Sequence, residues 1–221
     1  MDVIVVDLEN QITFNKGEKQ YIIEIGAAKV RNSKVISTFR RIVLPKTGHI
    51  RKSSRKMIGI TEAEMRKGIP LAKAMKEFEK WIGEDDYYIC TWSPSDLNIL
   101  INNYSIDAYP ISWLKNYTDI QKPISKVLGS HHPVSLKKAL EFANIDHEGR
   151  LHSGLDDSIN TANLFIKYEN NIHLFENNIN ELLVCSLYKK CRDCGEIVYH
   201  TEFEKGKCKQ CSSKVRKKVT L

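Results

Sequence analysis

The sequence has no long hydrophobic run. Its longest apolar stretches, such as Val3–Val6 and Leu182–Cys185, are far too short to cross a bilayer, so no membrane-spanning segment is expected. It also has no internal repeat and no low-complexity tract, and 42% hydrophobic with 28% charged residues is ordinary for a globular protein rather than a disordered or fibrous one. A basic and apolar leader is missing too, because a strand-like run follows Met1 and Asp2 at once. We therefore expect a protein that is not exported and stays in the cytoplasm.

Most of the chain carries almost no net charge. Residues 186–221 hold ten Lys or Arg and four Asp or Glu, whereas the rest of the chain holds 24 and 23. The formal charge of +7 thus lies almost wholly in the C-terminal segment. A basic end on a near-neutral domain indicates a polyanionic partner, of which nucleic acid is the commonest. A solubilising tail is the alternative that charge alone leaves open.

The order of hydrophobic patterns predicts an α/β fold. Three strand-like runs joined by short links, over Val3–Val6, Tyr21–Val30 and Val35–Leu44, indicate an antiparallel meander. Helices then alternate with strands. Helices are indicated by a capping box at Thr61 and Glu64, by an apolar stripe over 71–82, and by Ser93, Ser135 and Ser153 as N-caps. Strands are expected over 87–92 and 116–121. We expect an RNase H-like mixed sheet, the meander plus parallel strands, flanked by helices.

Four acidic residues and one histidine stand where chemistry is plausible. Asp7 and Glu9 are two residues apart on an extended segment, so both side chains leave the same face of the strand. Carboxylates side by side repel each other, and burying part of such a pair is costly without a cation. Hard oxygen ligands at this spacing suit Mg²⁺ or Mn²⁺.

The other members of the set lie at helix starts. Asp96 lies in the first turn of the helix that follows strand 87–92, and would come near Asp7 if that strand neighbours the first one. His152 precedes a helix whose first turn holds Asp157. Each acidic residue also has a local explanation, as part of a Ser93 or Ser153 capping box, as a complement to the helix dipole, or as a charged strand exit. The ordered set favours a common site.

These residues resemble a known family. Asp7-x-Glu9, then Asp96 within Thr-Trp-Ser-Pro-Ser-Asp, then His152-x₄-Asp157, resemble the DEDDh 3′-to-5′ exonucleases (DnaQ-like) of the RNase H-like superfamily. The similarity covers about residues 1–168 and is greatest to the branch with the histone-mRNA 3′-exonuclease and the sporulation-inhibitor-like nucleases. Further matching stretches are Ile22–Ala27, Gly59–Thr61, Thr91-Trp92 and Asp119–Gln121. The spacing from His152 selects Asp157 rather than Asp156.

The resemblance implies a two-metal mechanism. Asp7 would bridge two Mg²⁺ or Mn²⁺ ions, with Glu9 and Asp157 on one and Asp96 on or near the other. His152 would be the general base for the attacking water, and the product would be a 5′-mononucleotide. The substrate would be a single-stranded 3′ end, with RNA favoured over DNA because the nearest resemblance is to RNA-trimming enzymes.

The chain departs from the family beside the acidic pair, where Asn10-Gln11 replaces the small or aromatic residues common in relatives. This concerns contacts to the terminal nucleotide and leaves the metal ligands in place. Trp92 and Phe14 could stack on bases. Core packing is favoured for Trp92, and Phe14 stays undecided.

Four of the six cysteines form two Cys-x-x-Cys pairs, Cys191 with Cys194 and Cys208 with Cys211. Without an export signal, this pattern favours a metal over disulfides, and the spacing resembles a zinc ribbon that holds one structural Zn²⁺. A redox pair, free thiols and an iron–sulfur cluster are the alternatives.

The expected organisation is an exonuclease domain over 1–170, a linking helix over 171–188, and a zinc ribbon with a basic tail over 189–221. Two other functions remain open at this stage. One is a catalytically weak nucleic-acid-binding protein with a vestigial site. The other is an adaptor or DNA proofreading subunit that meets a protein partner through its zinc ribbon.

Overall fold

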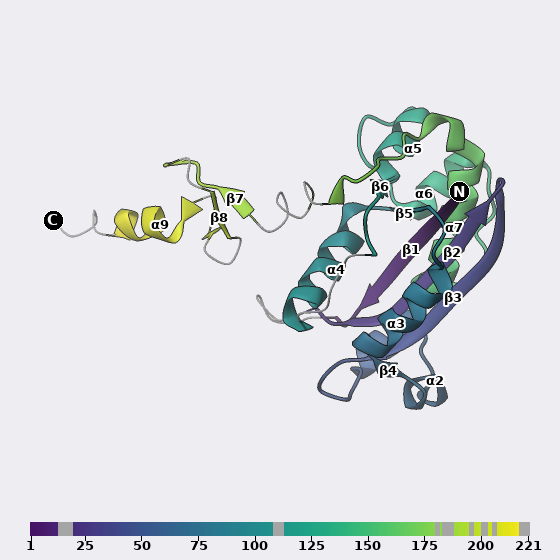
Figure 1. Ribbon diagram of the computed structural model, residues 1–221, viewed down its shortest axis with the longest axis horizontal. Helices are drawn as coiled ribbons and strands as arrows, with labels where there is room; N and C mark the ends of the chain where they lie inside the picture. Colours follow the sequence, from purple (N-terminus) through teal and green to yellow (C-terminus); the bar gives the residue numbers. More distant parts are fainter. Residues whose placement is uncertain are drawn as a thin grey trace. The chain divides into compact units, whose positions relative to one another are not determined.

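The computed structural model describes residues 1–12, 20–107, 113–179, 182, 188–194, 197–199, 203–204 and 207–216. For 104–107, 188–190, 197–199, 203–204, 208 and 213–216 it describes the backbone only. The chain divides into two compact units, Met1–Asn177 and Asn178–Leu221 (Figure 1). Among the described residues, no helix has both the length and the apolar character needed to span a bilayer.

The larger unit is built on a six-stranded sheet in the order β4-β3-β2-β1-β5-β6 (Figure 1). Strands β1, β2 and β3 pair antiparallel, β5 and β6 continue parallel to β1, and β4 is parallel to β3. The strands are β1 (Asp2–Asn10), β2 (Ile22–Arg31), β3 (Lys34–Leu44), β4 (Ile69–Pro70), β5 (Tyr87–Thr91) and β6 (Tyr117–Asp119). The predicted mixed sheet, a meander extended by parallel strands, is confirmed.

Helices cover both faces of this sheet. One face carries α3 (Leu71–Ile82) and α4 (Pro94–Asp107), and the other carries α5 (Gln121–Val127), α6 (Leu136–Ala143) and α7 (Gly154–Tyr168). The predicted capping box opens α2 (Glu62–Arg66): Thr61 Oγ1 accepts from Glu64 N–H, and the Glu64 carboxylate accepts from Thr61 N–H. Helices α1 (Lys52–Ile58) and α5 were not predicted, because neither segment has a continuous apolar stripe.

The alternation of side chains along β1 leads from the core to a polar end. Val3 and Val5 are buried in the cluster that packs beneath α5, α6 and α7. Because the side-chain period of a strand is two, the next residues on this face are Asp7 and Glu9. Leu8 points to the opposite face, where it is buried near α3 and α4. The core therefore positions the acidic pair on the face that α7 covers.

The predicted linking helix over 171–188 is wrong in its first part, whereas Ile179 and Leu182, which the structure describes further on, are helical. A short 3₁₀ helix, η1 (Glu169–Asn171), ends α7, and residues 172–178 are not helical. They follow the larger unit instead: Phe175 N–H donates to Thr118 Oγ1 at 3.1 Å, and Asn177 N–H donates to Asn116 Oδ1 at 2.8 Å. These hydrogen bonds replace the ones that a helix would supply. The larger compact unit ends at Asn177.

Among the residues described from Tyr188 onward, the smaller unit contains two short antiparallel pairs and a helix. They are β7 (Tyr188–Lys190) with β8 (Ile197–Tyr199), β9 (Phe203–Glu204) with β10 (Lys207–Cys208), and α9 (Lys209–Arg216). The helix was not predicted, and it begins directly after Cys208. The second cysteine pair therefore spans a strand-to-helix junction.

Candidate active site and cysteine cluster

Strand β1 contributes its acidic pair to the wall of the candidate site, and β2 pairs with it. In their register Asp7 lies opposite Gly26 and Glu9 lies opposite Glu24. A Cβ atom added to Gly26 would lie only 1.9 Å from the carbonyl carbon of Gly154, the first residue of α7. Only glycine permits so close an approach. The start of α7 thus rests directly on β2, with the side chains of its first turn beside the acidic pair of β1.

The loop before α7 is fixed to the helix through two neighbouring aspartates. Ser153 caps the helix by accepting a hydrogen bond from Asp156 N–H, and Asp156 Oδ2 accepts one from Arg150 N–H at 2.9 Å. Asp157 Oδ2 accepts from His152 N–H at 3.1 Å, while His152 has a left-handed backbone with φ of 61°. Asp157 lines the cavity described below and Asp156 does not. This placement agrees with the choice of Asp157 that the family spacing suggested.

Asp96 reaches the site from the other side of β1. It lies in the first turn of α4, and its Oδ1 accepts a hydrogen bond from Leu8 N–H at 3.0 Å. The pairing of β1 with β5 ends at Val6 and Thr91, so β5 offers no acceptor for the N–H of Leu8. The Asp96 carboxylate accepts this hydrogen bond instead. The expected approach of Asp96 to Asp7 and Glu9 follows from this hydrogen bond.

The five side chains line one cavity. It has a volume of about 620 Å³ and contains Asp7, Glu9, Asp96, His152 and Asp157 in its wall. Ligand atoms of Glu9, His152 and Asp157 all lie within 4.8 Å of one another. Asn10 and Trp92 also line it, yet Trp92 is only 7% exposed and packs in the core, as favoured from the sequence. Phe14 lies outside the described residues.

Burial raises the pKa of every carboxyl group of this cluster, and neighbouring carboxylates of the cluster add to the rise for Asp7 and Glu9. Burial is the main cause that raises the pKa of Asp7 well above its ordinary value, and the charges of Asp96, Glu9 and Asp157 add to it. Burial, then Asp157 and Glu24, raise the pKa of Glu9 to about 7. Burial also raises the pKa of Asp96 to about 6, against the hydrogen bond from Leu8. Such crowding of carboxylates is costly without a cation.

The donor set fits hard divalent cations. Four carboxylates from β1, α4 and α7 offer oxygen ligands in the wall of one cavity. Oxygen ligands of this kind suit Mg²⁺ or Mn²⁺. A cation would favour the charged form of these carboxylates and so lower their raised pKa values.

Two further residues near the site were not singled out from the sequence. Glu24 is fully buried on β2; its carboxylate pairs with Arg40 Nε at 3.0 Å and lies 3.4 Å from Leu155 N, at the start of α7. His147 lies beside Asp157, with 3.6 Å between His147 Nε2 and Asp157 Oδ1. Glu24 stands in a stretch that matches the family, but it matches no ligand position of the family and is therefore not among the predicted ligands. His147 gave none, because its position depends on the fold of a loop.

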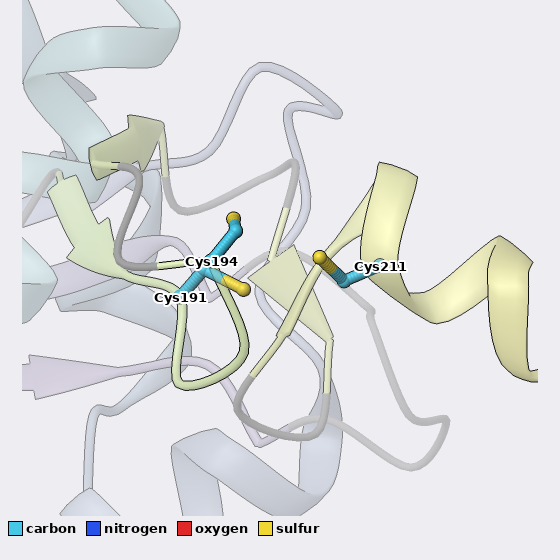
Figure 2. A group of neighbouring side chains, drawn as sticks. All are labelled: Cys191, Cys194 and Cys211. Atoms are coloured by element: carbon cyan, nitrogen blue, oxygen red, sulfur yellow. The ribbon is translucent and has the colours of Figure 1, made fainter.

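Three of the four predicted zinc ligands form a cluster in the smaller unit (Figure 2). Their sulfur atoms lie within 4.8 Å of one another; Cys191 and Cys194 come from the turn after β7, and Cys211 comes from α9. The side chain of Cys208 lies outside the described part of the chain. Thiolates brought together from separate elements suit a tetrahedral Zn²⁺ site.

Comparison with known proteins places the larger unit in a family. The RNase_T family, described as an exonuclease family, matches residues 4–165. The human protein named ERI1 exoribonuclease 2 is 29% identical over 190 residues, and its Xenopus laevis counterpart is 28% identical over 189. These matches cover 72% and 73% of this chain but 27% of each relative, so the chain spans about a quarter of their length.

Solved structures show the same fold. A full-length 3′-exonuclease superposes with a TM-score of 0.72 at 17% identity, over 90% of this chain and 89% of that one. The nuclease domain of 3′hExo, a DEDDh family member bound to rAMP, gives a TM-score of 0.69 at 19% identity, over 80% and 96% of the two chains. With the matched residues 4–165 enclosing all five side chains of the cavity, the chain belongs to the RNase_T exonuclease family.

Proposed function

We propose that this chain is a metal-dependent 3′-to-5′ exonuclease that hydrolyses phosphodiester bonds at nucleic-acid 3′ ends and releases 5′-mononucleotides. The observation that carries the proposal is the convergence of Asp7, Glu9, Asp96, Asp157 and His152 on one cavity, from β1, α4, α7 and the loop before it. Family membership of residues 4–165 supports the same reaction class.

The residues divide the chemistry between them. Asp7, Glu9, Asp96 and Asp157 would hold two Mg²⁺ or Mn²⁺ ions, which when bound activate water and neutralise charge on the leaving oxygen. His152 removes the proton of the attacking water as general base. Its exposed side chain and its backbone hydrogen bond to Asp157 suit this role, because the ring can reach solvent while its backbone stays fixed to a ligand. Asp96 also holds β1 in place through Leu8.

RNA is the substrate that we favour over DNA. The support is the name of the curated relatives, which are called exoribonucleases, and the likeness to a 3′-exonuclease whose structure is described as recognising the 3′ end of a histone-mRNA stem-loop. The cavity wall adds the amide side chains of Asn10, Gln20, Asn98 and Asn102 to the acidic cluster. Amides can donate to and accept from sugar hydroxyls and bases without adding charge.

A degradation assay with paired variants tests this function. RNA and DNA oligomers labelled at the 5′ end are incubated with Mg²⁺ or Mn²⁺ and the intact chain. We expect a ladder that shortens from the 3′ end, faster for RNA, and lost in Asp7→Asn and in Asp157→Asn. Asp156→Asn is the matched control, because an asparagine oxygen can still accept from Arg150 N–H. Binding without degradation by the intact chain would instead favour the vestigial-site alternative.

We further propose that Cys191, Cys194, Cys208 and Cys211 hold one structural Zn²⁺. The clustering of three of these sulfur atoms supports this proposal. The small size of the unit supports it too, because so short a segment buries too little apolar surface to fold without a metal. Its basic composition suggests that this unit contacts substrate phosphates upstream of the cut.

Truncation after Asn177 tests that role, because the two compact units divide there. We expect the truncated chain to release mononucleotides from short oligomers, with weaker binding to long ones and a shallower dependence of binding on salt. Unchanged binding and salt dependence would indicate a protein-docking role for the smaller unit.

A further inference from the structure

The two oxygen atoms of Asp157 have different surroundings. Oδ2 accepts the hydrogen bond from His152 N–H at 3.1 Å. Oδ1 faces His147, whose Nε2 lies 3.6 Å away. Both Oδ1 and His147 Nε2 are buried, and among the described residues neither has a hydrogen-bond partner. Each of these two atoms is therefore the evident hydrogen-bond partner of the other.

The loop that carries His147 is fixed to the same helix as Asp157. Asn160, which is fully buried one turn further along α7, donates from Nδ2 to the carbonyl oxygens of Glu148 and Asp156, both at 2.8 Å. Its Oδ1 accepts from Glu148 N–H at 2.9 Å. The residue after His147 is thus bound through both its backbone groups. These hydrogen bonds hold the loop of His147 against α7, so the fold keeps the imidazole beside the Asp157 carboxylate.

A distance of 3.6 Å is slightly too long for a hydrogen bond, but a small rotation of either side chain closes it. Closing it is favourable, because a buried polar atom without a hydrogen-bond partner destabilises the folded state. Hydrogen bonds at catalytic sites are also often long before ligands bind and tighten afterwards. An imidazole protonated at Nε2 donates without carrying charge.

We propose that His147 is a positioning residue whose Nε2–H donates to Asp157 Oδ1 and fixes the orientation of this metal-binding carboxylate. The inference rests on the proposed function, because it gives Asp157 a cation to bind. Hydrogen bonds from outside the ligand set orient carboxylate ligands and tune their affinity, and losing one typically costs about 10–100-fold in metal affinity. With His152 N–H on Oδ2 and His147 on Oδ1, both oxygens of Asp157 are held from the protein side.

Direct measurement of Mn²⁺ binding to the intact, zinc-loaded chain without nucleic acid tests the role. His147→Phe keeps a ring of similar shape and removes the donor, whereas His147→Gln places an amide N–H near the position of Nε2. Mn²⁺ dissociation constants come from electron paramagnetic resonance of the free ion. We expect His147→Phe to weaken binding about 10–100-fold and His147→Gln to recover most of that loss. In the degradation assay, His147→Phe should raise the Mn²⁺ concentration for half-maximal rate more than it lowers the rate at saturation.

Controls separate this role from packing and from the proposed function itself. His132→Phe replaces an exposed histidine in the turn before α6 and should bind Mn²⁺ like the unmodified chain. Affinity in His147→Phe equal to that of the unmodified chain would overturn the inference. Equal losses in His147→Phe and His147→Gln would overturn it too, because they would assign the effect to packing of the ring. If the unmodified chain bound no Mn²⁺ at all, the metal site of the proposed function would fail with it.

Discussion

The contact between Gly26 and Gly154 offers the sharpest test of how the fold builds the site. In Gly26→Ala, the new Cβ would lie 1.9 Å from the carbonyl carbon of Gly154 and 2.2 Å from Leu155 N. Ordinary contact begins at 3.4 Å, so the backbone at the start of α7 has to move by about 1.5 Å. Both close neighbours are backbone atoms, which no side-chain rotation can relieve.

This displacement should be felt most strongly by Asp157, which lies in the first turn of α7. A misplacement of about 1 Å at a catalytic group can cost about 100-fold in rate, which corresponds to about 2.7 kcal/mol of activation free energy. The overpacked interface should also lower the free energy of unfolding by about 1–3 kcal/mol. We therefore expect a folded variant whose single-turnover rate at saturating Mn²⁺ falls at least about 100-fold.

Gly48→Ala is the matched control for stability. Gly48 has φ of 69° and no atom within 4 Å of an added Cβ, so alanine there is strained but meets nothing. It should lower the free energy of unfolding by about 1–2 kcal/mol and leave the rate unchanged. A rate for Gly26→Ala close to that of the unmodified chain would refute the reasoning, because the approach of α7 to β2 would then not position Asp157.

Three other predictions follow from the same site and its surroundings. Because burial and neighbouring carboxylates raise the pKa of Glu9 to about 7 in the folded chain, the metal-free protein should lose up to about 3 kcal/mol of stability as the pH rises from about 4.5 through 7. Thermal denaturation should show this loss, Glu9→Gln should flatten it, and Mn²⁺ should raise the Tm more at pH 8 than at pH 5. Arg40→Met should lower the free energy of unfolding in urea by about 3 kcal/mol or more, because it leaves the buried Glu24 carboxylate without its cation, and adding Glu24→Gln should restore part of the loss. Cys191→Ser should abolish the one equivalent of Zn²⁺ detected by elemental analysis and leave degradation of short oligomers intact, whereas full zinc content in this variant would contradict the proposed ligand set.

The sequence predicts the sheet well, and it predicts that five residues from separate elements come together, for identifiable reasons. Strand β1 is a continuous β-branched run, and α3 has a regular apolar stripe, so local pattern and final structure agree. Asp7 and Glu9 share a face because of strand periodicity alone. The placement of Asp96 required one assumption, that β5 neighbours β1, and the parallel pairing of these strands satisfies it.

What the sequence could not predict depends on contacts between distant segments. Helix α1 has one strongly apolar residue inside the core, Ile58, and is held by tertiary contacts such as the hydrogen bond from Ile12 N–H to Ser54 Oγ at 3.0 Å. The segment after α7 has helix-like composition, but side chains of β6 and its flanks bind its backbone in a non-helical form. His147 belongs to the same class, since Asn160, thirteen residues further along the chain, holds the backbone of the loop that carries it.

The hydrogen bond between Asp96 and Leu8 has a consequence for how mutants of this site are read. Where β5 ends, the Asp96 carboxylate accepts the hydrogen bond from Leu8 N–H that a further residue of β5 would otherwise accept. Removal of the whole side chain would therefore fray the strand that carries two other acidic groups, and lost turnover would report two defects at once. An amide at position 96 keeps an oxygen for the Leu8 N–H and deletes only the negative charge. In this protein, an isosteric substitution separates chemistry from architecture where alanine scanning cannot.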